Sequence, residues 1–180
     1  HLGDYVDRGP ASAQVVKRIR EMEQDCKIPG MKVDVISLMG NHEDLMINAY
    51  REGRPGDVGL WFNNGGYPTL DSYGVQTQFD IPLEDNQWME NLPTQYKDEA
   101  NKILFVHAGI EYREFPEMHR QTNIWTRTFS FFNEDMWDDN SALDDWLVVH
   151  GHTPKTTSGE WSDRRINVDT GAVFKDMGVL

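Results

Sequence analysis

The sequence has little cysteine and no long hydrophobic run. Cys26 is the single cysteine among 180 residues, so an internal disulfide is excluded, and we predict that its thiol is inert. The apolar stretches fall short of the ~18–20 residues that a membrane helix needs, so no membrane partner is expected. From these absences we expect a cytoplasmic protein whose fold does not depend on disulfide bonds.

Positive charge is also scarce. The chain carries 17 Lys and Arg against 30 Asp and Glu, a formal net charge of −13. A broad, sequence-independent nucleic-acid binder needs a basic surface, so no nucleic-acid partner is predicted. A phosphate-binding pocket stays compatible with this balance, because local charge can oppose net charge. The six Trp, six Tyr and eight Phe can supply a core, which argues against disorder over the full length.

The first residues have the character of a loop that follows a strand, but the strand itself is absent. The chain opens at His1 with a stretch rich in Gly and Asp that ends at Pro10. We therefore expect 1–180 to be a single catalytic domain that is truncated at its N-terminus. The alternative is a naturally short protein that begins with a loop.

Apolar spacing predicts three helices. The first runs from Ser12, which could cap it, to about Met22, with an apolar stripe on one face. Two more are expected, one that follows the loop Gly40-Asn41-His42-Glu43 and runs to about Tyr50, and one over 85–91. The glycine-rich stretch 51–68 is predicted to be mostly loop.

Short apolar runs predict buried strands that alternate with these helices, as in an α/β fold. The predicted strands are 33–38, 103–106, 146–149 and 165–168. The acidic segment 134–145 is expected to be solvated.

Several predicted strands end in a glycine-containing loop that carries His, Asp or Asn. Four of the six histidines lie at such ends: His42, His107, His150 and His152. In α/β folds the loops at strand ends are where ligands bind. This recurrence marks the strand ends as the candidate site.

One carboxylate, one amide and two imidazoles make a candidate metal site: Asp4, Asn41, His107 and His152. A mixed set of oxygen and nitrogen donors suits manganese, iron or zinc, whereas calcium and magnesium prefer oxygen ligands alone. Asp4 has two carboxylate oxygens and could bridge two ions. Each residue taken singly could be a turn residue or a buried core histidine, but the four together favour metal binding.

Four further side chains could handle a phosphate group and a proton. Arg8 offers a planar fork for phosphate oxygens, and Arg127 could be a second clamp. Asp7 could orient His42 and raise its pKa, which would keep a proton available for a leaving group. The alternatives are a surface Asp-Arg pair in a turn, and an arginine that packs on Trp125 or lies at the surface.

Two neighbouring features have less specific interpretations. His150 and His152 would face one side of an extended segment, and we choose His152 as the ligand. His150 then supports the site or makes a structural hydrogen bond. The aromatic and glycine-containing stretch 61–66 is expected to be a packed loop, bordering the pocket.

These motifs together resemble the calcineurin-like metallophosphoesterases, in particular bacterial members of the phosphoprotein phosphatase branch. Four motifs carry the likeness: Gly3-Asp4-Tyr5-Val6-Asp7-Arg8-Gly9, Gly40-Asn41-His42-Glu43, Val106-His107-Ala108-Gly109 and Gly151-His152-Thr153-Pro154. The first motif is specific, the third would be weak alone, and the ordered set spans nearly the whole chain. The family's first motif, an Asp-x-His on the preceding strand, is not found in this sequence.

The resemblance implies a four-layer α/β/β/α sandwich that holds two divalent metal ions, manganese first, with iron or zinc as alternatives. Asp4 would bridge both ions, and Asn41, His107 and His152 would complete the second site. The missing motif leaves the first site incomplete. Arg8 and Arg127 would hold the phosphate, while His42, oriented by Asp7, would protonate the leaving oxygen after attack by a metal-bridging hydroxide.

On this resemblance we expect a serine/threonine protein phosphatase that acts on phosphorylated protein or a small phosphoester. One alternative is a symmetrical dinucleoside polyphosphate hydrolase that cleaves diadenosine tetraphosphate. A fragment that binds metal and phosphate without catalysis is another, since the first metal motif is missing. The sequence leaves the oligomeric state open.

Overall fold

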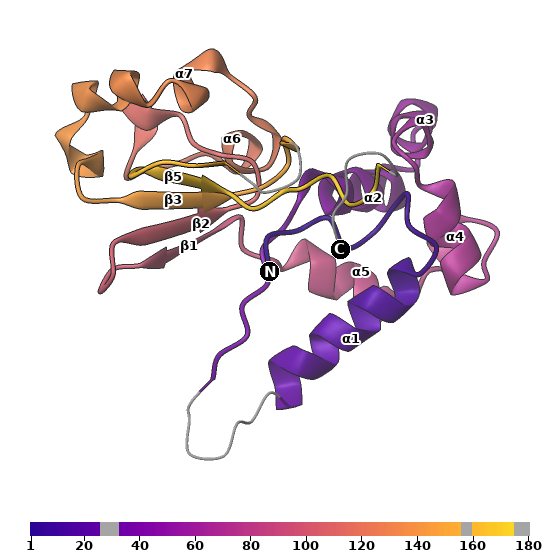
Figure 1. Cartoon of the computed structure of the whole chain (residues 1–180). Coiled ribbons are helices and arrows are strands. Elements are labelled where there is room, and N and C mark those ends of the chain that lie inside the picture. Colours follow the sequence, from indigo (N-terminus) through magenta and orange to yellow (C-terminus); the bar gives the residue numbers. More distant parts are fainter. Residues whose placement is uncertain (26–32, 156–159, 175–180) are drawn as a thin grey trace. The chain divides into compact units, whose positions relative to one another are not determined.

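A computed structural model describes residues 1–25, 33–155 and 160–174. The chain divides into two compact units: His1 with Gly3–Leu92, and Leu2 with Pro93–Leu180. Helices make up the regular structure described in the first unit, and the second contains a sheet (Figure 1). The α/β class predicted from the sequence is therefore confirmed, while the single catalytic domain stays a prediction.

The first unit contains five α-helices and a short 3₁₀ helix in its described residues. They are α1 (Ser12–Asp25), α2 (Asn41–Glu52), α3 (Pro55–Asn63), α4 (Tyr67–Tyr73), η1 (Gln78–Asp80) and α5 (Leu83–Glu90). Helix α2 packs against both α3 and α5, and α1 packs against α4. The core between them includes Val16, Met46 and Trp61, each with no exposed surface.

Three helices fall where the sequence predicts them, but Ser12 has a different role from the one expected. It is the first residue of α1, and its hydroxyl lies 3.3 Å from that of Thr69. The apolar stripe also holds only in part: Val16 and Ile19 are buried, whereas Val15 is exposed.

The loop predicted over 51–68 is wrong, because α3 occupies half of it, α2 ends within it and α4 begins within it. Pro55 stands at the start of α3, a position that suits proline because its missing N–H would have no partner within the helix. Burial of the Trp61 side chain outweighs the low helix propensity of the glycines. Tertiary packing therefore decides the structure here.

The strand predicted over 33–38 is also not found. Its final residues pair with the start of the chain, since Leu38 N donates to His1 O at 2.9 Å and the His1 amino group donates to Ile36 O at 2.7 Å. Both hydrogen bonds go to the single residue His1 and do not continue as a ladder between two strands, so no strand is assigned over 33–38.

The second unit contains a sheet of five short strands with the order β1-β2-β3-β5-β4. These are β1 (Gln95–Asp98), β2 (Ile103–Val106), β3 (Leu147–His150), β4 (Glu160–Trp161) and β5 (Arg165–Asn167). Strands β2, β3 and β5 run parallel, and the two edge strands are antiparallel to their neighbours. The three central strands match the predictions to within one residue at each end, whereas β1 and β4 were not predicted.

Short helices and 3₁₀ turns connect β2 to β3. They are η2 (Tyr112–Glu114), α6 (Arg120–Trp125), α7 (Phe129–Phe132), η3 (Glu134–Asp139) and η4 (Ser141–Leu143). Their apolar side chains share one core with the sheet, which includes Leu104, Val148 and Phe131. The acidic segment 134–145 is therefore not simply solvated, because Trp137 and Leu143 are buried in that core.

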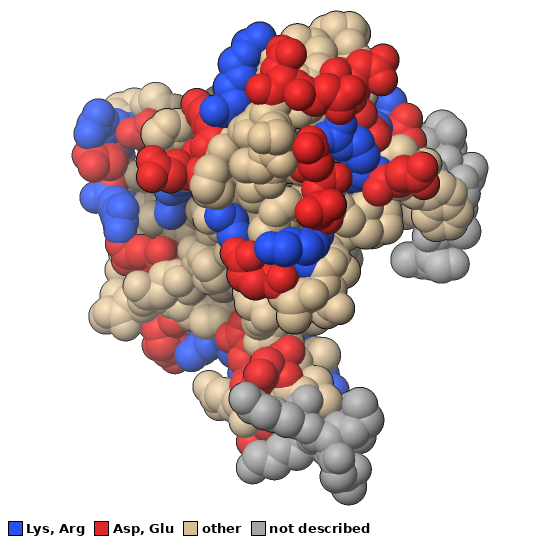
Figure 2. All heavy atoms as spheres, turned by 90° about the vertical axis from the view of Figure 1, so that its left-hand side faces the viewer, with Lys and Arg blue, Asp and Glu red and all other residues tan. Residues whose placement is uncertain are grey.

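Charges of both signs are interspersed on the surface that Figure 2 presents, with described Lys and Arg side chains lying beside Asp and Glu. Arg164, for example, pairs with Asp138 at 2.6 Å. None of the described helices has the length and hydropathy of a membrane span. The prediction for the Cys26 thiol concerns a residue outside the described part of the chain.

Candidate active site

The loop that carries Asp4, Asp7 and Arg8 is organised by a buried glutamate. One carboxylate oxygen of Glu43 accepts from Asp4 N at 2.9 Å and from Gly40 N at 2.8 Å, and the other accepts from Tyr5 N at 2.6 Å. Glu43 is the third residue of α2, so the start of this helix and the loop share one set of hydrogen bonds. The loop is therefore held against the N-terminus of α2.

Close approach explains the glycine at position 40. A Cβ atom there would lie 2.4 Å from Asp4 Oδ1 and 2.5 Å from Asp4 N. The His42 N–H also faces that oxygen, 3.3 Å away. Asp4 and the first residues of α2, including Asn41, thus form one compact group of polar atoms within the first unit.

Backbone strain is concentrated at the predicted site residues. Asp4, Asp7, Arg8 and His152 have φ values between 60° and 72°, a region that residues other than glycine rarely adopt. Such conformations cost about 1–3 kcal/mol each and tend to gather at functional sites. Lys102 is the other described residue of this kind, at a turn before β2. The strain supports these positions independently of the sequence motifs.

Asp7 and His42 form a buried hydrogen-bonded pair, as the sequence analysis predicts. His42 Nδ1 lies 2.7 Å from Asp7 Oδ2, and both side chains are almost fully buried. The other carboxylate oxygen accepts from Trp61 Nε1 at 2.9 Å and from the Thr69 hydroxyl at 2.8 Å. Because both oxygens of Asp7 are engaged, the imidazole is held with Nδ1 toward the carboxylate and Nε2 away from it.

The electrostatics of this pair favour a protonated imidazole. Burial lowers the pKa of His42, but the hydrogen bond to Asp7 and the negative charges of Asp4 and Asp7 outweigh it, so the pKa lies above its ordinary value. Burial, helped by the charge of Asp4, raises the pKa of Glu43 to about 7 against the opposing effect of its backbone donors. The His42 imidazole is therefore suited to donate a proton, and carboxylate groups lie next to it.

Arg8 and Asn41 lie beside this pair in the sequence and in the first unit. The Arg8 side chain is exposed, and its backbone N donates to Gly65 O at 2.9 Å. Asn41 is the first residue of α2 and is buried. Of the residues predicted for the site, the first unit thus brings together Asp4, Asp7, Arg8, Asn41 and His42.

The second unit brings together His107 and His152, which follow the neighbouring parallel strands β2 and β3. Their ring nitrogens, His107 Nε2 and His152 Nδ1, lie 3.1 Å apart. The Gly151 N–H donates to His107 O at 2.8 Å, which fixes the two loops to each other. Both rings are buried at the carboxyl edge of the sheet, where the sequence analysis expects ligands.

Arg127 belongs to the same group. Its Nε donates to His152 Nε2 at 2.9 Å, and its Nη2 donates to His152 O at 3.1 Å. An arginine cannot accept, so His152 Nε2 is the acceptor and its Nδ1 carries the proton. In the same way, His107 Nδ1 donates to Leu2 O at 2.6 Å, so His107 Nε2 is the acceptor of the His152 Nδ1–H at 3.1 Å.

The spacing of these two imidazoles fits a shared divalent cation. Ligand nitrogens at about 2.0–2.1 Å from an ion with tetrahedral or octahedral angles stand roughly 2.9–3.4 Å apart, and the observed 3.1 Å falls in this range. A backbone carbonyl orients the far nitrogen of His107, as is usual for histidine ligands. The spacing of the pair is therefore compatible with two ligands of one ion, but His152 Nδ1 would have to give up its proton, and the contact of Nε2 with Arg127 would have to change, before this ring could bind one.

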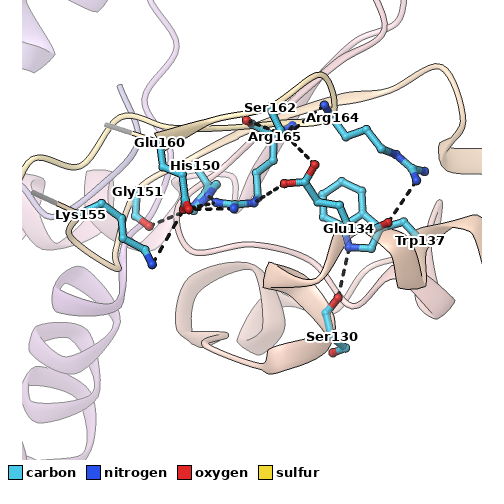
Figure 3. A network of polar contacts seen from close by, with 10 residues as sticks. All are labelled: Ser130, Glu134, Trp137, His150, Gly151, Lys155, Glu160, Ser162, Arg164 and Arg165. Carbon is cyan, nitrogen blue, oxygen red and sulfur yellow. Dashed lines mark hydrogen bonds and ion pairs between the residues drawn. The ribbon is translucent and has the colours of Figure 1, made fainter. Parts of the chain in front are cut away.

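His150 is buried and takes part in a different network (Figure 3). Arg165 Nη1 donates to its Nε2 at 3.1 Å, so its Nδ1 carries the proton, and that atom lies 3.0 Å from Gly151 O. Burial, followed by the charge of Arg165, lowers the pKa of His150 to about 4 against the effect of the carbonyl. A neutral, doubly hydrogen-bonded imidazole fits the supporting role predicted for His150.

Three residues of the site were missed by the sequence analysis as contributors to chemistry: Glu43, Trp61 and Thr69. The signal for Glu43 was available, since a glutamate at the third position of a helix commonly accepts backbone N–H groups in front of it. Trp61 and Thr69 reach Asp7 only through the packing of α3 and α4, which no local pattern encodes. The stretch 61–66 is the end of α3 and a turn rather than the packed loop expected.

Comparisons with known proteins identify the family of the chain. The family model of the calcineurin-like phosphoesterases matches residues 1–176, so the chain belongs to that family of metal-dependent hydrolases. A solved structure provisionally assigned as a diadenosine tetraphosphatase superposes with a TM-score of 0.61 at 17% identity, covering 95% of this chain and 69% of that one. At that identity the likeness concerns the fold, and it confirms the metallophosphoesterase fold predicted from the sequence.

Several relatives of low sequence identity are named for the same activity. The asymmetrical bis(5'-nucleosyl)-tetraphosphatase PrpE of Anoxybacillus flavithermus is 26% identical over 96% of this chain and 70% of its own length. The PrpE proteins of Halalkalibacterium halodurans and Bacillus thuringiensis are 23% and 25% identical with the same coverage. These names favour the dinucleoside polyphosphate alternative over the serine/threonine protein phosphatase expected first.

Proposed function

We propose that the protein hydrolyses dinucleoside polyphosphates, with diadenosine tetraphosphate as the test substrate, by adding water across a phosphoanhydride bond so that two nucleotides are released. The observation that carries the proposal is the buried Asp7–His42 pair on a strained loop, 2.7 Å between Nδ1 and the carboxylate. The activity for which the relatives are named supplies the substrate class.

His42 is the proposed general acid. With Nδ1 committed to Asp7, its Nε2 is the atom that would give a proton to the leaving oxygen of the substrate. A phosphate or nucleotide leaving group departs more easily when its oxygen is protonated, so a raised pKa suits this role. Asp7 acts by orienting the imidazole and by stabilising its charge.

Arg8 and Arg127 are the proposed phosphate-binding residues. Each guanidinium can donate two hydrogen bonds to non-bridging phosphoryl oxygens and offset their charge in the transition state. Arg127 is already fixed by two hydrogen bonds to His152. Both side chains are exposed, as a group that meets substrate must be.

We propose that Asp4, Asn41, His107 and His152 are the metal ligands, with manganese, iron or zinc as the ion. A divalent cation would supply a Lewis acid for the phosphoryl oxygens and lower the pKa of the attacking water. The carboxylate, the amide oxygen and the two imidazoles suit such ions. Elemental analysis of purified protein should find two ions per chain for an enzyme with both sites filled, whereas a non-catalytic fragment with an incomplete site would hold one ion or none.

Product analysis tests the substrate and the bond that is cleaved. Incubation with diadenosine tetraphosphate and Mn²⁺, followed by anion-exchange chromatography, should yield ATP and AMP in equal amounts if the cleavage is asymmetrical, as the names of the relatives state. Two molecules of ADP would instead indicate symmetrical cleavage, the alternative that the sequence left open. Release of phosphate from a phosphoserine peptide, without cleavage of the dinucleotide, would favour the protein phosphatase and overturn the proposal.

A further inference from the structure

Helices α3 and α4 of the first unit (Figure 1) carry three aromatic residues, Trp61, Phe62 and Tyr67, whose rings form a continuous stack. The ring centroids of Trp61 and Phe62 lie 5.1 Å apart with 25° between their planes. Phe62 and Tyr67 lie 4.3 Å apart with only 10° between their planes. The Phe62 and Tyr67 rings are close to parallel, so a further flat ring could stack face to face on them.

Exposure increases steadily along this stack. Trp61 is fully buried, Phe62 is half-buried and Tyr67 is 61% exposed. The inner ring is therefore fixed by the core of the unit, while the outer ring is presented to solvent. Pro68 follows Tyr67 in the first turn of α4, which restricts the backbone that carries the exposed ring.

The inner end of the stack is attached to the proposed catalytic pair. Trp61 Nε1 donates to Asp7 Oδ1 at 2.9 Å. The turn that joins Phe62 to Tyr67 also packs against the proposed phosphate-binding arginine, because Arg8 N donates to Gly65 O at 2.9 Å and a Cβ at Gly65 would lie 2.7 Å from Arg8 Cγ. The aromatic stack and Arg8 are thus built on the same turn.

We infer that Tyr67 is a stacking platform for a nucleobase of the substrate, placed so that a nucleotide whose phosphate meets Arg8 can lay its base on the exposed ring. A nucleobase is flat on both faces, so it could stack on Tyr67 and extend the stack that Trp61 and Phe62 begin. The inference rests on the proposed function and adds to it the residue that selects nucleotides over other phosphoesters. Stacking is tolerant of base identity, so adenine and guanine dinucleotides should be bound similarly.

The test compares two substrates, diadenosine tetraphosphate and the base-free ester glycerol 2-phosphate. Tyr67→Ala should raise the KM for the dinucleotide by roughly 5- to 100-fold, the range expected for loss of one aromatic–base contact, with a much smaller change in kcat. The ratio of kcat/KM values, dinucleotide over base-free ester, should fall by the same factor. Tyr67→Phe keeps the ring and should restore the ratio.

Phe79→Ala is the matched control, because Phe79 is an aromatic residue of the same unit with 59% exposure that packs on Tyr50 outside the stack. It should leave the ratio unchanged. If the wild-type protein cleaves the dinucleotide and Tyr67→Ala leaves its KM unchanged, the platform is wrong while the proposed function stands. If the wild type hydrolyses glycerol 2-phosphate and not the dinucleotide, both the proposed substrate and the platform are overturned.

Discussion

The two compact units present their functional side chains in different ways. In the first unit, Asp4, Asp7 and Arg8 stand on a loop with positive φ values that is held by side-chain acceptors such as Glu43. In the second unit, His107 and His152 follow adjacent parallel strands, and backbone pairing of the sheet places them. One half of the proposed site depends on a polar network and the other on sheet topology.

This difference predicts how each half should respond to change. A hydrogen-bonded loop under strain loses its geometry when one acceptor is removed, because several donors are left without partners. A pair of histidines at strand ends keeps its backbone when one ring is removed. Removal of an acceptor in the first unit should therefore affect catalysis and local order together, whereas ligand substitutions in the second should remove metal binding, and the hydrolysis that depends on it, without disturbing local order.

The largest effect is expected from the proposed metal ligands. Asp4→Asn in the first unit and His107→Ala in the second should each reduce bound metal and hydrolysis to background, because both donate to the proposed site. Elemental analysis and phosphoesterase activity are the measurements. Asp71→Asn and His119→Ala, which change exposed residues of the same types, are the controls. Retained metal in either ligand variant would remove that residue from the site.

His42→Asn should separate chemistry from metal binding. Metal content should stay at the wild-type level while turnover falls by about 10²–10⁴-fold, the usual contribution of a general acid. Steady-state kinetics and elemental analysis on the same preparation would measure both. Unchanged turnover would show that proton transfer at His42 does not contribute to the rate. The Asp7–His42 pair would then be structural.

The two units also differ in how much of them the sequence predicts. The strand ends at His107 and His152 follow from short apolar runs bounded by glycine, so the sheet and its histidines could be located by pattern alone. Loop 3–9 could be recognised by its motif, but its strained backbone and the acceptors that hold it could not. The contacts of Trp61 and Thr69 with Asp7 depend on the packing of α3 and α4, a region where the glycines misleadingly indicated a loop.

Edge strands were missed for a physical reason. β1 and β4 are short and only partly buried, with polar residues such as Lys97 and Glu160, so they lack the apolar signal of a core strand. Their structure comes from pairing with β2 and β5. The failed strand over 33–38 is the reverse case, an apolar run whose backbone finds no ladder among the described residues.

Arg165→Met should weaken the second unit without touching a proposed ligand. The buried guanidinium of Arg165 donates to Glu134, Glu160 and His150, and methionine would leave these acceptors without it. Loss of charged hydrogen bonds of this kind should lower the free energy of unfolding by about 2–3 kcal/mol, measured by urea denaturation.

Arg18→Met is the control for that measurement, since Arg18 forms an exposed ion pair with Glu21 on α1. Surface pairs contribute little, so its effect should stay below about 1 kcal/mol. Equal losses in the two variants would contradict the view that the network in Figure 3 stabilises the sheet.

The smallest effect is expected from Trp61→Phe, which keeps an aromatic ring in the core and removes one hydrogen bond to Asp7. Asp7 Oδ1 would still accept from Thr69, and Oδ2 would still hold His42. Turnover should therefore fall only about 3- to 10-fold, the equivalent of roughly 1 kcal/mol for one lost bond. Fixed-time assays of the wild type, Trp61→Phe and His42→Asn would measure the loss of turnover in each variant. A loss as large as that of His42→Asn would mean that the indole, rather than the carboxylate network as a whole, sets the orientation of the imidazole.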